Sequence, residues 1–224
     1  DIDWLFNNYN FLKISFSIDE LIILNIRNKK KNFNNFCSLV KKITEKIFIP
    51  IGVGGGVEKE EDVKKILRSG ADKIIINNLI INNKKMLNKI SKQIGRQSII
   101  GSIDIIKNNN KLYVYDNNKN KIYKEFNQFL REIPYDQLGE LYITSIDRDG
   151  TGQGYLLEIL DKFKNNFKSP IIISGGAGNW KHLLEGLQHK NINAVSTANL
   201  LNFIGDGFKN ARKELQKRFE LPKW

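Results

Sequence analysis

The sequence predicts an α/β fold, because short apolar segments alternate with amphipathic helical segments along nearly its whole length. The apolar segments are continuous runs, which is typical of parallel strands covered on both faces. Short connections between the two kinds of segment indicate βαβ units. The pattern repeats in the second half of the chain, which favours a closed (β/α)8, or TIM, barrel built from two half-barrels. An open doubly wound sheet is the structural alternative, but it would not require the repeat.

Seven apolar segments are the predicted strands. They lie at residues 20–26, 48–53, 72–77, 97–104, 140–146, 170–174 and 193–197. Helices are expected between them, near residues 35–46, 59–69, 83–93, 125–132, 155–165 and 180–188. A closed barrel needs eight strands, so one strand is expected to precede Asp1, with residues 3–13 as the helix of that first unit. The 224 residues are therefore expected to form a single barrel domain that is incomplete at its N-terminus.

Residues 107–123 depart from this alternation. Two short β-rich runs, Leu112–Tyr115 and Lys121–Tyr123, flank the turn-forming sequence Asp116-Asn117-Asn118. This arrangement predicts a β-hairpin inserted after the fourth barrel unit.

The two halves share a strand and a glycine-rich loop. Glu20–Ile26 resembles Glu140–Ile146, which lies 120 residues later, and Gly54-Gly55-Gly56 resembles Gly175-Gly176-Ala177-Gly178, which begins 121 residues later. Glycine at the end of a buried strand lets backbone N–H groups approach an anion, and the N-terminus of the following helix favours negative charge. Ordinary βα turns are the alternative, but two matching loops favour a substrate with two phosphate groups.

Composition narrows the functional class. The formal net charge is +12, which suggests nucleic-acid binding, but the lysines are scattered at helical spacing and no aromatic–basic RNA-binding motif accompanies them. A solvated basic surface, or a preference for phosphorylated small substrates, fits better. The apolar runs are too short to span a bilayer, the acidic N-terminal segment is unlike a signal peptide, and the single cysteine fits a reducing compartment, so a cytoplasmic enzyme is expected.

Carboxylates follow two of the predicted strands. Asp104 ends one strand, and Asp147 and Asp149 follow another, at the positions where this fold carries its chemistry. Such carboxylates can act as a general acid or base, although Asp147 and Asp149 could equally cap a turn or helix. His182 and His189 have no metal-ligand spacing with other candidates, so they are expected to be surface residues and no metal or cofactor is expected.

Several motifs together resemble the family of cyclase subunits of imidazole glycerol phosphate synthase. They are the segment Ser145–Thr151, the loop Ser174–Gly178 with His182, the loop Val53–Gly56, and Gly70–Lys73 with Asn77. The resemblance covers nearly the whole chain. It implies a lyase of histidine biosynthesis that forms a heterodimer with a glutaminase subunit and needs no cofactor. Ammonia from the glutaminase would pass through the barrel and combine with a phosphoribulosyl aminoimidazole carboxamide nucleotide, giving imidazole glycerol phosphate and an aminoimidazole ribonucleotide.

The resemblance also implies roles for individual residues. Of the family's two acid–base aspartates, one matches Asp104 and the other belongs to the strand expected before Asp1. The positions implied to bind the substrate and its phosphates are Gly55, Gly56, Asn77, Thr144, Asp149, Gly176, Gly178 and Ala198. The charged ring where ammonia would enter the barrel matches Glu20, Lys73 and Glu140, and its arginine would lie on the strand before Asp1.

Some positions depart from the family pattern. Asn25 stands where the family usually has aspartate, and Ile75 and Asn199 stand where it commonly has serines near phosphate. The stretch from Asn199 to Trp224 looks more like a paralogous group found with surface-polysaccharide genes, which is thought to make acetamidino sugars and typically lacks the first catalytic aspartate. A third alternative is a non-catalytic barrel that only scaffolds and channels ammonia. An aspartate on the expected first strand would favour the cyclase, and an apolar residue there would favour the other two.

Overall fold

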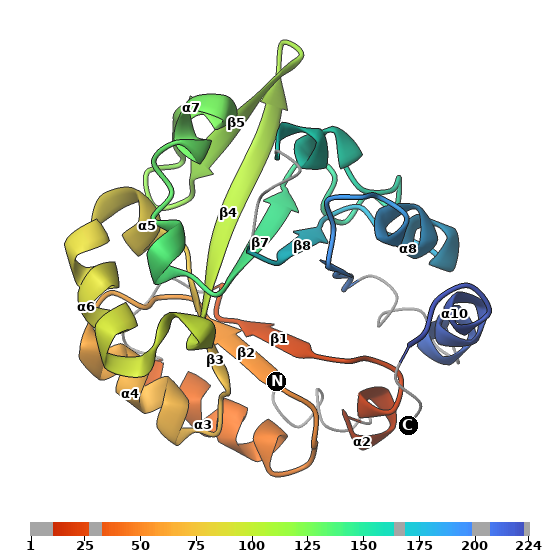
Figure 1. Cartoon of the computed structure of the whole chain (residues 1–224). Helices are drawn as coiled ribbons and strands as arrows, with labels where there is room; N and C mark the ends of the chain where they lie inside the picture. The colour runs from red at the N-terminus through yellow and green to blue at the C-terminus, as the bar shows by residue number, and fades with distance from the viewer. Residues whose placement is uncertain (1–10, 27–32, 164–168, 199–206, 222–224) are drawn as a thin grey trace. The chain divides into compact units, whose positions relative to one another are not determined.

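The computed structural model describes residues 11–26, 33–163, 169–198 and 207–221 (Figure 1). The chain divides into two compact units, the first reaching Ile100 and including Glu220 onwards, and the second comprising Gly101–Phe219. No helix in the described ranges is long and apolar enough to cross a membrane.

The first unit is built on three parallel strands that lie side by side in chain order. They are β1 (Leu21–Leu24), β2 (Ile51–Gly54) and β3 (Lys73–Ile76). Its helices are α2 (Phe11–Ser15), α3 (Phe33–Thr44), α4 (Glu60–Arg68), α5 (Asn78–Asn82) and α6 (Lys84–Ile94), followed by the short 3-10 helix η2 (Arg96–Ser98). Figure 1 shows α3 and α4 beside β2 and β3.

The core of the first unit follows from its sequence pattern. All four residues of β2 are buried, and so are the three isoleucines of β3. Helix α3 contributes Val40 and Ile43 and helix α4 contributes Val63 and Ile66, two pairs at the spacing that places both side chains on one helix face. Continuous apolar strands and amphipathic helices thus bury their matching surfaces against each other.

The second unit is also a parallel βα array. Its main strands are β4 (Ile99–Asn108, beginning in the last two residues of the first unit), β7 (Glu140–Ser145), β8 (Ile171–Ser174) and β9 (Ala194–Val195). Strands β7, β8 and β9 pair in parallel in that order. The helical elements are α7 (Phe126–Leu130), α8 (Trp180–Leu187), α10 (Gly207–Gln216) and the 3-10 helices η3 (Tyr135–Gln137) and η4 (Leu157–Lys162), with α10 in contact with α8.

An antiparallel meander interrupts this array. Strand β4 continues past Asp104 to Asn108, and β5 (Lys111–Asp116) returns along it and pairs with β6 (Lys121–Glu125). The turn between β4 and β5 uses Asn109 and Asn110 with φ of 47° and 59°. Asparagine tolerates this left-handed backbone better than most residues, so the asparagine-rich sequence suits a tight hairpin.

The structure differs from the predicted elements in several places. The strand expected from residue 48 begins at Ile51, because Pro50 lacks the N–H that a ladder needs, and Phe48 is 91% exposed. An extra short helix, α5, precedes α6, since the Asn83 side chain accepts from Met86 N and starts a new helix there. The helix predicted at 155–165 is the 3-10 helix η4, and the α10 helix was not expected. Residues 1–10, which carry most of the predicted first helix, lie outside the described residues.

Candidate active site

The glycine loops after β2 and β8 have the same backbone geometry. Gly55 has φ of 95° and Gly175 has φ of 91°, a conformation that favours glycine. A Cβ on Gly55 would lie 2.3 Å from the Asn25 carbonyl oxygen, and one on Gly175 would lie 2.4 Å from the Ser145 carbonyl oxygen. In each unit, therefore, only glycine lets the loop pack on the end of the preceding strand.

The hydrogen bonds around these loops repeat at the same spacing. In each unit a leucine at the start of one strand, the first residue of β1 or the second of β7, donates to a proline carbonyl. The first residue of the next strand donates to a side chain that follows a helix. The bonds are Leu21 N to Pro50 O (3.0 Å) with Leu141 N to Pro170 O (2.9 Å), and Ile51 N to Asp72 Oδ2 (2.8 Å) with Ile171 N to Asn193 Oδ1 (2.9 Å). The paired strands share this register, Leu21 with Ile51 and Leu141 with Ile171. The repeat at the loops is thus 120 residues, not 121, which makes Gly55 and Gly56 equivalent to Gly175 and Gly176.

The loop amides are arranged to receive an anion. Among the described residues, the backbone N–H groups of Gly55, Gly56 and Gly176 meet no hydrogen-bond acceptor. Each loop leads into the N-terminus of a helix, α4 or α8, whose dipole favours negative charge. Open amides beside a helix N-terminus are what a phosphate group requires.

Gly178 differs from the expected phosphate ligand. Its N–H donates to His182 Nδ1 at 3.1 Å, and a Cβ on it would lie 2.7 Å from the Cα of Gly152. The residue therefore makes room for the loop after β7, and its amide is engaged within the protein.

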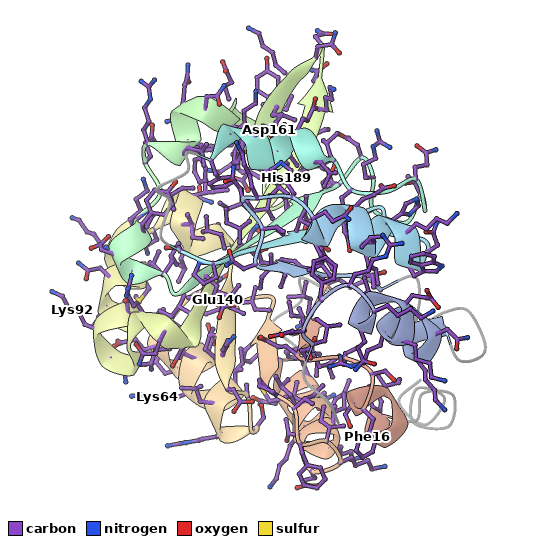
Figure 2. All side chains as sticks on the ribbon, turned by 45° about the vertical axis from the view of Figure 1, so that its right-hand side comes forward. Phe16, Lys64, Lys92, Glu140, Asp161 and His189 are labelled. Carbon is purple, nitrogen blue, oxygen red and sulfur yellow. The ribbon has the colours of Figure 1, made fainter. Side chains whose placement is uncertain are left out.

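His182 belongs to the candidate site, although a surface position is predicted for it from the sequence. It is half-buried, its ring packs against Gly154, and it caps the second glycine loop through Gly178. The first unit has the same device 120 residues earlier, where Asp62 Oδ2 accepts from Glu58 N at 3.1 Å. The signal that could have found His182 is this repeat, since both side chains lie at the third residue of their helix. His189 instead lies beside Asp161, with Nε2 and Oδ1 3.1 Å apart (Figure 2).

Asp104 and Asp147 have different surroundings in the second unit. Asp104 is half-buried in β4 between the buried Ile103 and Ile105, so its side chain faces away from theirs, and its Oδ2 accepts from the Asn117 side chain. Asp147 is exposed and accepts from Lys107 N at 2.5 Å, which ties the loop after β7 to β4. Asp147 therefore acts as a structural link, and Asp104 remains the acid–base candidate.

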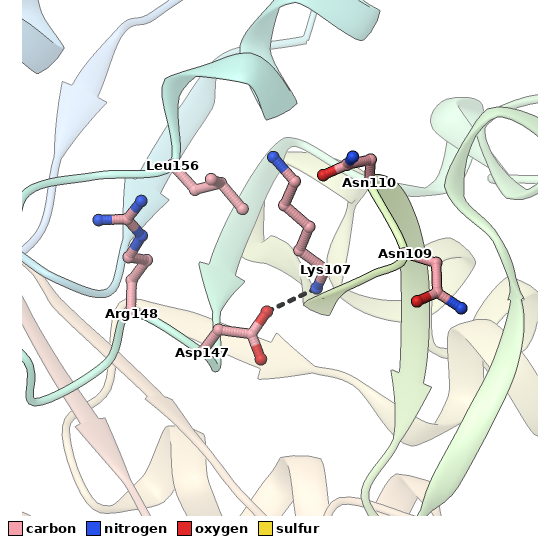
Figure 3. Close-up of a pocket in the computed structure, with 6 residues that line it drawn as sticks. All are labelled: Lys107, Asn109, Asn110, Asp147, Arg148 and Leu156. Atoms are coloured by element: carbon pink, nitrogen blue, oxygen red, sulfur yellow. Dashed lines mark hydrogen bonds between the residues drawn. The ribbon is translucent and has the colours of Figure 1, made fainter.

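A polar pocket of about 480 Å³ lies beside this link (Figure 3). Its lining residues are Lys107, Asn109, Asn110, Asp147, Arg148 and Leu156. The Lys107 ammonium pairs with Glu158 at 2.8 Å, and Arg148 contacts Gln153 O at 3.5 Å. Arg148 also packs close to Gly176, whose added Cβ would lie 3.0 Å from the arginine Cβ. The pocket thus adjoins the second glycine loop and carries basic side chains.

A hydroxyl network supports the strand ends next to the second loop. The Tyr142 hydroxyl donates to Ser174 Oγ at 2.7 Å and lies 3.2 Å from Ser196 Oγ, while the Tyr155 hydroxyl donates to Ser196 O at 2.9 Å. Burial, and secondarily the neighbouring Tyr142, raises the pKa of Tyr155 far above its usual range, so it remains a donor. The network holds β8 and β9 together just before Gly175 and Ala198.

The remaining predicted site residues are placed as follows. Thr144 is half-buried near the end of β7, paired with Ser174, and Asn77 precedes α5 at the end of β3. Asp149 and Ala198 are exposed, each after a strand. Among the described residues no group of His, Cys, Asp and Glu could hold a metal ion. Asn199 lies outside them.

The predicted gate residues lie at the N-terminal ends of their strands. Glu20 directly precedes β1 and Lys73 begins β3, and Lys73 Nζ lies 2.9 Å from Glu20 Oε2 with both side chains about three-quarters buried. Glu140 begins β7 in the second unit and is half-buried (Figure 2). The first two thus form an ion pair, and their joining with Glu140 into a ring stays a prediction.

Sequence comparison finds a family match over a range that includes both glycine loops and Asp104. The family described as histidine biosynthesis protein matches residues 13–204. The chain belongs to this family.

Its relatives in the histidine biosynthesis family carry related names. A protein of Parasynechococcus marenigrum (strain WH8102), provisionally named imidazole glycerol phosphate synthase subunit hisF2, is 40% identical over 230 residues, which cover 100% of this chain and 84% of that protein. The imidazole glycerol phosphate synthase subunit HisF of Chlorobium phaeobacteroides (strain DSM 266 / SMG 266 / 2430) is 32% identical over 201 residues, covering 89% of this chain and 80% of that protein. That of Pelodictyon phaeoclathratiforme (strain DSM 5477 / BU-1) is 31% identical with the same coverage.

Membership of the histidine biosynthesis family and the two parallel βα units together confirm the predicted α/β class of TIM-barrel type, built from two half-barrels.

Proposed function

We propose that this chain is the cyclase subunit of an imidazole glycerol phosphate synthase, a lyase of histidine biosynthesis. It would use ammonia to convert a phosphoribulosyl aminoimidazole carboxamide nucleotide into imidazole glycerol phosphate and an aminoimidazole ribonucleotide. The names of its relatives support this assignment. The observation that carries it is the pair of equivalent glycine loops with open amides, because this substrate has two phosphate groups to bind.

Each half-barrel would hold one phosphate. In the first unit the amides of Gly55 and Gly56, with Asn77 nearby in the chain, would bind one group. In the second unit the amide of Gly176, with Thr144 and Ala198, would bind the other, and Gly178 would contribute by shaping the loop. Asp149 would line the substrate site. Asp104, at the level where β4 leaves the parallel array, would transfer a proton to or from the reacting atoms.

The ammonia would come from a glutaminase subunit bound where the strands begin. The ion pair of Glu20 and Lys73 supports this part of the proposal, because two largely buried charges at the start of strands have no role in chemistry at the strands' other ends. Together with Glu140 they would form the entrance for ammonia. Pull-down from the native cell should recover a glutamine-hydrolysing subunit, and recovery of none, with ammonia but not glutamine supporting turnover, would contradict this partner.

The activity can be tested directly with the nucleotide substrate and an ammonium salt. Chromatography should detect both products, and Asp104→Asn should lower turnover by at least ~10²-fold, the usual contribution of general acid–base catalysis. Asp136→Asn, the same change on an exposed carboxylate of η3, is the matched control and should keep wild-type turnover. Absence of both products from the wild-type protein, or near-normal turnover by Asp104→Asn, would contradict the proposal.

A second candidate is ammonia delivery for acetamidino modification of surface-polysaccharide sugars. It is favoured by Ile75, which is 2% exposed and packs against Gly54, so that an apolar side chain stands beside the first loop where a serine is common. Under this alternative the nucleotide is not consumed, and glutamine-derived ammonia instead reaches a sugar amidotransferase. If the barrel serves only as a scaffold, Asp104→Asn should leave that delivery unchanged.

A further inference from the structure

The turn between β5 and β6 reaches back to Asp104. In the meander, Ile105 of β4 pairs with Val114 of β5. Asp104 lies one residue before Ile105 on β4, and Asn117 lies three residues after Val114, just past the end of β5. The Asn117 side-chain amide donates a hydrogen bond to Asp104 Oδ2. The inserted meander therefore places a neutral donor against the carboxylate proposed to carry the chemistry.

The turn that carries Asn117 is itself fixed. Asp116 is 2% exposed, and its Oδ1 accepts from Asn118 N at 3.0 Å and from Lys119 N at 3.2 Å. The Tyr115 hydroxyl donates to Asn120 Oδ1 at 2.5 Å. The Asn120 backbone is left-handed, with φ of 50°. A side chain on a loop held at both ends loses little further freedom when it forms one more hydrogen bond.

Charged groups of the turn and of β4 form pairs of their own. In the turn, Asp116 Oδ2 lies 3.4 Å from Lys119 Nζ. On β4, the Lys107 ammonium is bound to Glu158, and its backbone N–H is bound to Asp147. The amide of Asn117 is thus the donor from the turn that contacts Asp104 directly.

We propose that Asn117 is a positioning residue for Asp104, an inference that rests on the proposed function. Its amide orients the carboxylate and stabilises the ionised form, because an amide N–H can donate to a carboxylate but cannot take up its proton. The meander between β4 and α7 is therefore part of the catalytic apparatus: it sets the geometry and the working pH range of Asp104.

Steady-state kinetics with ammonium salt across a pH series tests this inference. Asn117→Ala should lower kcat about 10-fold, the effect of losing one hydrogen bond to a charged group. It should leave KM within about 3-fold, since the bond does not contact the substrate. Asn117→Asp keeps the size of the side chain and should move the acidic limb of the kcat–pH profile upward by about one pH unit, because a second carboxylate disfavours ionisation of the first.

Asn118→Asp is the matched control, because it adds the same charge to the next residue of the same turn, and its acidic limb should stay at the wild-type position. If Asp104→Asn abolishes turnover while both Asn117 variants keep the wild-type kcat and pH profile, the role of Asn117 is overturned and the cyclase assignment stands. If Asn118→Asp shifts the limb as far as Asn117→Asp, the effect is general electrostatics and the specific role is again overturned. Near-normal turnover by Asp104→Asn would instead overturn the proposed function itself.

Discussion

The two units use one backbone plan and support it in different ways. Strand registers, proline contacts, loop glycines and helix starts recur at a spacing of 120 residues. In the second unit, however, the glycine loop is enclosed: Gly154 N donates to Gly176 O at 2.7 Å, and Gly178 packs on Gly152. In the first unit, a Cβ on Gly56 would meet only the Phe33 ring among the described residues, at 3.9 Å.

The comparison distinguishes the features that both glycine loops share from the features that surround only the second loop. Both units keep a glycine that packs on the preceding strand and a side chain at the third helix position that caps the loop. The loop after β7 in the second unit carries Asp147, Arg148 and Asp149 and borders the pocket. Under the proposed function, the features that both units share would bind phosphate, and the loop after β7, with Asp104 of β4, would belong to the chemistry and the choice of substrate.

The largest difference is expected between Gly176→Ala and Gly56→Ala. Both residues have positive φ, 103° and 81°, so each substitution should cost about 1–2 kcal/mol of unfolding free energy for the backbone conformation. A Cβ at position 176 would also lie 2.1 Å from the Gly154 carbonyl oxygen, which should add about 1–3 kcal/mol of overpacking. Urea unfolding of the two variants measures the difference. Equal losses would mean that the loop after β7 gives way freely, and that the second site is not enclosed.

Much of this comparison was predictable from the sequence. The apolar strands, the glycine loops and the duplicated halves can be predicted from local sequence patterns. Strands that are buried on both faces require apolar residues, and positive φ favours glycine. The extent of β4, the link from Asp147 to Lys107 N and the contact of Asn117 with Asp104 do not. They depend on which strands pair in the meander, and no local signal fixes that pairing. His182 was misjudged because a polar histidine in a helix resembles a surface residue unless the register of the repeat is known.

A smaller effect is expected at the two loop caps. His182→Ala removes the acceptor of Gly178 N, and Asp62→Ala removes the acceptor of Glu58 N and of Lys59 N. Each should cost about 1 kcal/mol of unfolding free energy, the usual contribution of a capping side chain. His182→Asn can restore an acceptor and should recover part of the loss. If His182→Ala is neutral while Asp62→Ala is costly, the two caps are not equivalent and the repeat ends at the strands.

The smallest effect is expected at Asp72 and Asn193, whose side chains accept hydrogen bonds from the first backbone N–H of β2 and of β8. Asp72 accepts from Ile51 N at 2.8 Å, and Asn193 accepts from Ile171 N at 2.9 Å, so the geometry is matched and only the charge differs. Hydrogen bonds to a charged partner contribute about 1.5–3 kcal/mol and neutral ones about 0.5–1.5 kcal/mol, and both side chains are exposed, so values near the lower limits are expected. Asp72→Ala should therefore destabilise the protein by about 1 kcal/mol more than Asn193→Ala.

The exchange variants Asp72→Asn and Asn193→Asp test the cause, because each keeps the acceptor and changes only its charge. Asp72→Asn should lose, and Asn193→Asp should gain, up to about 1 kcal/mol of unfolding free energy, the part of the hydrogen bond that the charge supplies. If Asn193→Asp is instead destabilising, the second unit does not accept a carboxylate at this point, and the two halves have diverged in electrostatics as well as in their loops.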